Sequence, residues 1–269
     1  MQALAPHLAF PWRYRALLWT LTHREIVARY RGSVLGTLWS LLTPLLMLAV
    51  FTLVFGIVLP SRWPGAAGEG IGMFALALLS GLLLHTLLAD VLSKAPGLIV
   101  TQPNYVTKMV FPLEALGWIS LLAALFHAGC GLLLLVLVNG VWGSGFALPQ
   151  LALPVILLLF SVMVLGLAWL FAALGVYVRD LVQLVGPLIM VLMFMGPVFF
   201  PRSAMPEPMR PWLALNPITI PIEQARRVIF DGHWPDWASL GWYALAACAM
   251  YLFGLWVFNT LKKGFADVL

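Results

Sequence analysis

The chain has 269 residues, of which 62% are hydrophobic and 9% are charged. Because soluble domains carry about 25% charged residues, this composition excludes an ordinary soluble globular protein, and the high hydrophobicity excludes an intrinsically disordered one. The net charge of +5 comes from basic residues that flank apolar runs instead of clustering, which argues against nucleic acid as a partner. We therefore expect a single transmembrane domain over residues 1–269.

The N-terminal segment 12–31 is basic and aromatic, and it directly precedes the first long apolar run. Thr22 and Glu25 have the spacing of a capping box, in which two side chains satisfy free backbone donors at a helix start, and Gly32 is a plausible helix stop. An amphipathic basic helix of this kind suits the anionic cytoplasmic surface of a membrane. It either anchors the chain and fixes its topology or also contributes to contacts between subunits.

The spacing of the charged residues predicts the number of membrane spans. Runs of 30, 20, 64, 21 and 25 residues contain no Asp, Glu, Lys or Arg, and one helical crossing needs roughly 20 apolar residues. The run of 64 must therefore hold two spans, which turn in the Gly-rich stretch from Asn139 to Gly145. We predict an all-α membrane protein with six transmembrane helices near residues 37–59, 71–92, 115–138, 149–177, 182–200 and 238–260. The first five of these spans occupy residues 37–200.

The distribution of Lys and Arg predicts the orientation of the spans. With both termini in the cytoplasm, the inner side carries ten basic residues and the outer side five, which agrees with the positive-inside rule. The inner residues are Arg13, Arg15, Arg24, Arg29, Arg31, Lys94, Lys108, Arg179, Lys262 and Lys263. The outer residues are Arg62, Arg202, Arg210, Arg226 and Arg227.

Two charged connections are expected on the cytoplasmic side. The loop from Lys94 to Pro112 is rich in turn residues, and it either docks a soluble partner or simply joins two spans. The Arg179-Asp180 pair lies between the predicted fourth and fifth spans. It is either a topology anchor capped by its own carboxylate or a point of contact with a partner.

The outer segment 202–236 is too polar and too rich in proline to cross a membrane. Thr219 could cap a helix that runs to Asp231, with Pro221 in the first turn and Gly232 at its end. The apolar residues of this segment are expected at the outer interface or dipping back into protein, where non-spanning backbone is tolerated. The segment is either an aromatic belt beside the last span or an outer gate.

Residues that carry chemistry are scarce in this sequence. It contains no Gly-Lys dipeptide and therefore no Walker A loop, so ATP hydrolysis by this chain is not expected. Asp90 is the one acid inside the predicted spans and lies near a helix end, which argues against ion-coupled transport. We expect His85 and His127 to be packing residues. Cys130 and Cys248 lie in apolar runs, and neither disulfide nor metal-site spacing is present.

Aromatic residues are abundant, with 16 Phe, 12 Trp and 6 Tyr. Sugar rings stack on aromatic faces through their apolar C–H surfaces, so aromatic side chains with few charges could line a conduit for a polyol polymer. Each of these residues could equally face lipid. The candidate lining residues are Phe51, Phe55, Phe194, Phe199 and Phe200.

Three segments together resemble the membrane subunit of a type-2 ABC exporter, in the branch that moves lipid-linked polysaccharides such as O-antigen, capsule or teichoic acid. Residues 23–56 read HREIVARYRGSVLGTLWSLLTPLLMLAVFTLVFG and resemble a basic helix that leads into a first span. Residues 175–201 contain Arg179-Asp180 before a fifth span that ends in GP. Residues 216–232 read NPITIPIEQARRVIFDG and resemble the outer re-entrant helix between spans five and six.

The resemblance implies a permease formed by two copies of this chain with two ABC ATPase subunits, which carry the ATP and magnesium. It implies periplasmic and outer-membrane export components as further partners. Residues implied in contact with the ATPase are Gln102, Asn104, Lys108, Arg179 and Asp180, and those of the interface helix include Glu25, Arg29 and Arg31. Residues implied in the outer gate are Trp212, Asn216, Pro217, Arg226 and Arg227, and the two arginines would suit an anionic polymer or lipid headgroup.

The sequence is thus interpreted as the permease subunit of an ATP-driven exporter of lipid-linked polysaccharide in the bacterial inner membrane. Six helices enclose too little space for a sugar polymer, so we expect a two-fold dimer with the first and fifth spans facing its axis. One alternative is a type-2 ABC permease for a drug or a lipid. Another, from a different class, is an ATP-independent membrane enzyme that acts on lipid-linked sugars.

Overall fold

A computed structural model of the chain describes residues 10–54, 71–107, 111–199, 202 and 207–269. Within these ranges the regular structure is helical, which confirms the predicted all-α class. The α-helices are α2 (Phe10–Arg13), α3 (Arg15–Arg29), α4 (Trp39–Leu53), α5 (Ile71–Lys94), α6 (Pro103–Thr107), α7 (Glu114–Trp142), α8 (Leu153–Tyr177), α9 (Leu181–Phe194), α10 (Arg210–Leu215), α11 (Thr219–Ile229), α12 (Trp237–Leu261) and α13 (Phe265–Val268). Short 3-10 turns are η1 (Gly36–Leu38), η3 (Ala95–Gly97), η4 (Leu148–Ala152), η6 (Glu207–Met209) and η7 (Lys262–Gly264).

Five helical segments of the described chain are long and apolar enough to cross a membrane. They are Gly36–Leu53, Met73–Gly97, Glu114–Trp142, Leu148–Tyr177 and Trp237–Val268. Each overlaps one of the predicted spans, so the chain is a multi-pass membrane protein. The run of 64 uncharged residues turns where the sequence predicts, since α7 ends at Trp142 and Gly145 has a φ of 90°.

The helix expected over residues 182–200 is shorter than predicted. α9 has 14 residues, or about 21 Å at 1.5 Å per residue, which is less than the ~30 Å of a hydrocarbon core. It ends at Phe194 because Pro197 disfavours helical backbone at the residue before it and removes a backbone donor. Buried turn residues from Gly196 to Val198 follow.

The start of the N-terminal helix also differs from the prediction. α3 begins at Arg15, so Thr22 lies inside the helix, and its hydroxyl is buried without a hydrogen-bond partner among the described residues. The capping box is therefore wrong, because the preceding residues Ala16 to Leu21 are themselves good helix formers that extend the helix toward the N-terminus. α3 ends at Arg29, a little before the predicted stop, and Gly32 has a φ of 85° in the turn that follows.

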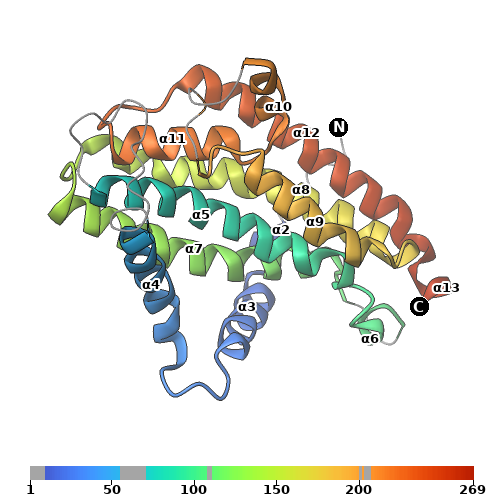
Figure 1. Cartoon of the computed structure of the whole chain (residues 1–269). Coiled ribbons are helices and arrows are strands. Elements are labelled where there is room, and N and C mark those ends of the chain that lie inside the picture. Colours follow the sequence, from blue (N-terminus) through green and yellow to red (C-terminus); the bar gives the residue numbers. More distant parts are fainter. Residues whose placement is uncertain (1–9, 55–70, 108–110, 200–201, 203–206) are drawn as a thin grey trace.

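The long helices α5, α7, α8 and α12 run side by side and form the body of the bundle (Figure 1). α8 and α12 pack closely because two glycines face each other at their crossing. A Cβ on Gly254 would collide with the carbonyl group of Gly166. At such a small-residue crossing the helix backbones touch, which favours helix association within a membrane.

Two helices extend away from this body. α3 and α4 project below it and are joined by a bend, with α3 contacting α7 and α4 contacting α5 and α7 (Figure 1). α4 leaves most of its apolar surface uncovered, including Leu46, Met47, Val50 and Leu53. This face requires lipid or another protein surface to cover it.

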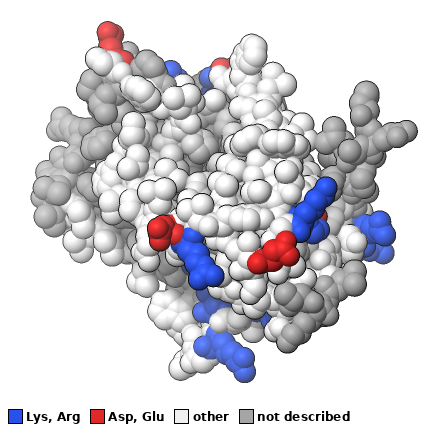
Figure 2. All heavy atoms as spheres, turned by 90° about the vertical axis from the view of Figure 1, so that its right-hand side faces the viewer, with Lys and Arg blue, Asp and Glu red and all other residues white. Residues whose placement is uncertain are grey.

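One end of the bundle gathers the charged connections. The C-terminal ends of α5, α8 and α12, the start of α9 and the small helices α6 and α13 lie at the right of Figure 1, and we call this the α6 end. Viewed from that side, Lys and Arg lie beside Asp and Glu around a broad uncharged surface (Figure 2). The opposite end, where α7 turns into α8, is the far end.

Candidate functional site

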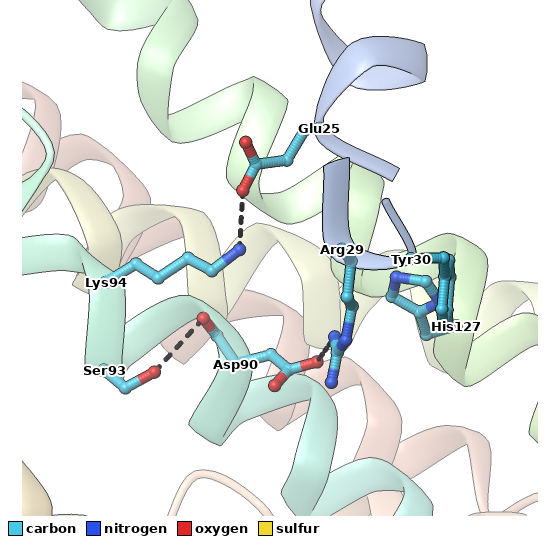
Figure 3. Close-up of polar contacts among 7 residues, drawn as sticks. All are labelled: Glu25, Arg29, Tyr30, Asp90, Ser93, Lys94 and His127. Atoms are coloured by element: carbon cyan, nitrogen blue, oxygen red, sulfur yellow. Dashed lines mark hydrogen bonds and ion pairs between the residues drawn. The ribbon is translucent and has the colours of Figure 1, made fainter. Parts of the chain in front are cut away.

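Helix α3 is attached to the bundle by a set of polar contacts that we call the α3 junction (Figure 3). Glu25 accepts a hydrogen bond from Lys94 with an N–O distance of 2.6 Å, and Arg29 donates to Asp90 at 2.7 Å. One helical turn of α3 separates the two α3 residues, and one turn of α5 separates their partners, so the pairs are stacked along both helices. The α3 junction fixes α3 along the last turns of α5.

A third contact of the α3 junction reaches α7. The Tyr30 hydroxyl lies 3.1 Å from Nδ1 of His127, and their rings meet edge to face with centroids 5.5 Å apart. Burial opposes the charged form of Arg29, but the neighbouring Asp90 carboxylate outweighs this effect and raises the pKa of Arg29 above its ordinary value. The Arg29 guanidinium is therefore stabilised in its charged form.

A small cavity lies behind the α3 junction. Its volume is about 10 Å³. It is lined by Ser120, by His127 and by the four residues of the two ion pairs. The Ser120 hydroxyl is buried and has no hydrogen-bond partner among the described residues. A space of this size is about that of one water molecule; it is too small for a substrate, so the α3 junction positions helices instead of binding cargo.

A second set of contacts fixes the α6 end. Glu114, at the start of α7, accepts a hydrogen bond at 2.8 Å from Lys262 at the end of α12. Its backbone carbonyl accepts another at 3.1 Å from Nε1 of Trp169 on α8. The Tyr177 hydroxyl donates to the carbonyl of Leu261 at 2.9 Å. These bonds join three spanning helices at the end where partner contacts are expected.

The residues expected to contact an ATPase lie at this α6 end. Gln102 and Asn104 belong to the connection that contains α6, Asn104 is exposed, and Lys108 lies outside the described residues. Tyr105 stacks on Phe111 with ring centroids 4.4 Å apart, and α13 packs against α6. The described part of this loop projects from the bundle and is held in place by the aromatic stack and by α13 (Figure 1).

Arg179 and Asp180 are both exposed in the turn that leads into α9. Asp180 occupies the N-cap position of α9, but its side chain makes no capping hydrogen bond. The pair is therefore available to a partner at the α6 end, and the structure does not bring it into contact with the α3 junction.

The proposed lining residues are only partly brought together. Phe194 is exposed and stacks on Phe199, with centroids 5.5 Å apart. Phe51 lies half-buried on α4. Phe55 and Phe200 lie outside the described residues. The Phe194–Phe199 stack gives the end of α9 a flat aromatic surface of the kind that sugar rings can contact.

The segment expected to form a gate divides into two helices. α10 is short and leaves Trp212 and Leu215 exposed. α11 lies against α5 and α8 with most of its residues buried. The predicted helix from Thr219 to Asp231 is confirmed in position, although Ile218 and not Thr219 is its N-cap residue. The apolar face of α11 packs into protein, and whether the helix re-enters the membrane stays a prediction.

Polar side chains hold α11 at both ends. Asn216 donates to the carbonyl of Leu192 on α9 at 2.7 Å, and the Tyr243 hydroxyl donates to the carbonyl of Pro217 at 2.9 Å. At its C-terminal end, the carbonyl of Ile229 accepts hydrogen bonds from three side chains in the last turn of α7 and in the connection to α8. These are Asn139, Ser144 and Gln150, at 3.0, 3.3 and 3.4 Å.

The two arginines of α11 have different surroundings. Arg227 is exposed. The guanidinium of Arg226 points into the protein and donates to backbone carbonyls of Ala77, Pro197 and Val198. Sequence reasoning singled out Arg226 for its charge on the outer side and missed these acceptors, because a backbone carbonyl has no signature in a sequence.

Comparisons with known proteins cover nearly the whole chain. A family model described as ABC-2 type transporter matches residues 16–230. The O-antigen export system permease protein RfbA of Myxococcus xanthus is 29% identical over 262 residues, which is 95% of this chain and 96% of that protein. Two proteins of the same name from Klebsiella pneumoniae are 24% and 23% identical over 254 residues, covering 94% of this chain and 95% of each relative.

Proposed function

The chain belongs to the ABC-2 type transporter family, and from this premise we propose that it is the membrane permease subunit of an ATP-driven exporter of lipid-linked, O-antigen-type polysaccharide. The observation that carries the proposal is the similarity to O-antigen export permeases from two organisms over at least 94% of the chain. Five segments that can span a membrane support the role of a permease.

The proposed energy source is a separate ABC ATPase that binds at the α6 end. The braced α6 loop and the exposed pair Arg179 and Asp180 supply a surface for it. ATP and magnesium would reside on that partner. Because the α3 junction ties α3 to α5 and α7, a displacement at the α6 end would move these helices together, as two-state transport requires.

The proposed working unit contains two copies of this chain. α4 leaves nearly all of its apolar surface uncovered, and α9 exposes Val182, Leu184, Met190 and Phe194 on one protomer. If the exposed faces of α4 and α9 from two protomers met around a two-fold axis, they would enclose a conduit that one protomer cannot form. We place both termini and the α6 end in the cytoplasm and the protein in the bacterial inner membrane, with envelope export components as further partners.

A reconstituted complex tests this function. The chain would be purified with its ABC ATPase, inserted into vesicles and supplied with lipid-linked O-polysaccharide. We expect ATP-dependent movement of the polymer across the bilayer and stimulation of ATP hydrolysis by the polymer. Stimulation by a drug or a lipid without polymer movement would favour the ABC-2 permease for those substrates. Chemical conversion of the lipid-linked sugar by this chain alone would favour a membrane enzyme.

A further inference from the structure

Arg226 connects three parts of the chain that are far apart in the sequence. Five hydrogen bonds join its guanidinium to other described residues, with donor–acceptor distances from 2.6 to 3.3 Å. Two go to the carbonyl of Ala77 and one to the hydroxyl of Ser80, both on α5. The other two go to the carbonyls of Pro197 and Val198, which follow α9. One side chain of α11 therefore fixes the start of α5 and the end of α9 at the same point.

The chemistry of these acceptors explains why an arginine is suited to the position. A buried backbone carbonyl outside a regular helix needs a hydrogen-bond donor from elsewhere in the protein. α9 ends early at Phe194, and Pro197 and Val198 lie in the buried turn that follows, so their carbonyls require such donors. A planar guanidinium presents several donors in a fixed fork and can serve two chain segments at once, whereas a lysine ammonium cannot span them in the same way.

Gly81 on α5 lets the Arg226 guanidinium and Val198 approach the helix backbone, because glycine has no Cβ. A Cβ on Gly81 would lie 2.9 Å from Nη2 of Arg226 and 3.1 Å from Cα of Val198. Both distances are shorter than normal packing allows, so a larger residue at position 81 would push α9 and the guanidinium away from α5. Gly81 and Arg226 thus form one packing unit.

The neighbouring helix α10 buries Leu213 but leaves Trp212 and Leu215 exposed. α11 is held more extensively, because Asn216 and the contacts of Ile229 described above also fix it. Among the described residues between α9 and α12, those of α11 are therefore the most firmly attached to the body of the protomer. The position of α11 therefore fixes the residues that follow α9, which lie next to the Phe194–Phe199 stack.

We propose that Arg226 is a positioning residue that keeps the far end of the conduit closed by fixing α11 and the end of α9 on α5. The inference rests on the proposed function, since it assumes that α9 lines a conduit. The resting permease is then sealed by this clamp, and transport requires α9 to move relative to α5 at this point. Arg226 does not contact cargo in this arrangement, because its donors are directed at acceptors within the protein.

The clamp is tested by leakage from vesicles that contain the complete ABC complex and trapped calcein, without ATP. We expect Arg226→Ala to release calcein several-fold faster than the wild type and to export less polymer for each ATP hydrolysed. Arg226→Lys should fall between the two, because an ammonium cannot serve both chain segments as a guanidinium does. An Arg226→Ala complex that retains calcein and exports polymer like the wild type would overturn the clamp.

A second pair of variants keeps Arg226 and guards against a folding defect. Gly81→Ala should reproduce the leak by displacing the guanidinium, whereas Gly129→Ala on α7, where an added Cβ meets nothing within 4 Å, should remain tight. A tight Gly81→Ala complex would also count against the clamp. If the wild-type complex exports no polymer, the proposed function fails, while calcein release still decides whether Arg226 seals the protein.

Discussion

At the scale of single residues, burial determines how much each ion pair contributes to the stability of the fold. The Glu114 side chain is 11% exposed in its pair with Lys262, whereas Glu25 is 41% exposed in its pair with Lys94. Exposed pairs contribute roughly 0–1 kcal/mol because water screens them and long side chains lose entropy. A buried charge that loses its partner costs more, because it remains desolvated.

We therefore predict that Lys262→Gln lowers the stability of the purified protein by about 1–3 kcal/mol. The substitution removes the ammonium and leaves the largely buried Glu114 carboxylate without its partner. Thermal unfolding in detergent measures the effect, and Lys94→Gln, which orphans the more exposed Glu25 and is expected to cost less than about 1 kcal/mol, is the matched control. Equal shifts for the two variants would contradict this ranking.

A second residue-level prediction concerns the exposed turn before α9. Reversing both charges, as in Arg179→Glu with Asp180→Arg, should leave membrane insertion and thermal stability unchanged, because neither side chain caps α9 or is buried. Export and polymer-stimulated ATP hydrolysis should fall several-fold if the pair contacts the ATPase. Normal coupling in the double variant would show that the pair is a topology anchor instead.

Sequence reasoning found the charged residues but not what they contact. It placed Glu25 in a local capping box, whereas the folded chain pairs it with Lys94, 69 residues away. It assigned Arg226 to a gate from its charge and side of the membrane, but the acceptors of Arg226 are backbone carbonyls and the Ser80 hydroxyl, up to 149 residues away. Partners of this kind are set by how the helices pack, which local patterns do not record.

At the scale of helices, the gaps between charges were sufficient to place most spans. Long apolar runs must be helical in lipid because every backbone group needs a partner, so α5, α7, α8 and α12 begin and end within a few residues of the predicted limits. The prediction was wrong for the end of α9, where apolar character continues past Phe194 but Gly196 and Pro197 stop the helix. Hydrophobicity alone did not register this break.

The crossing of α8 and α12 gives a prediction at this scale. Gly254→Ala should destabilise the protein by about 1–3 kcal/mol, the range for overpacked sites, because the new methyl group collides with the backbone of Gly166 and the two helices must separate. Gly241→Ala on the same helix is the control, since a Cβ there meets nothing within 4 Å. We expect the control to be neutral or stabilised by up to ~1 kcal/mol from helix propensity.

Thermal unfolding of both variants in the same detergent measures this difference. A loss of stability confined to Gly254→Ala would place the cost at the helix crossing. If Gly241→Ala lost as much stability as Gly254→Ala, the effect would arise from the glycine-to-alanine change in α12 itself, and the close crossing would not be its cause.

At the scale of the whole molecule, the uncovered surfaces are unevenly placed. α4 projects below the bundle, whereas α12 lies along its top (Figure 1). Both helices expose large apolar side chains, such as Val50 on α4 and Leu245 on α12. α12 packs along its length against α8 and needs only lipid on its other face, but α4 has little protein around it. A second copy would cover α4 first.

Cysteine cross-linking between copies tests this arrangement. In a background with Cys130 and Cys248 replaced by alanine, Val50→Cys should form a covalent dimer on oxidation in the membrane, because α4 would lie near the two-fold axis. Leu245→Cys, which is similarly exposed but lies on the opposite side of the bundle, should remain monomeric on denaturing gels. Cross-linking at position 245 but not at 50 would place α12 at the axis, and the conduit could not then be formed by α4 and α9.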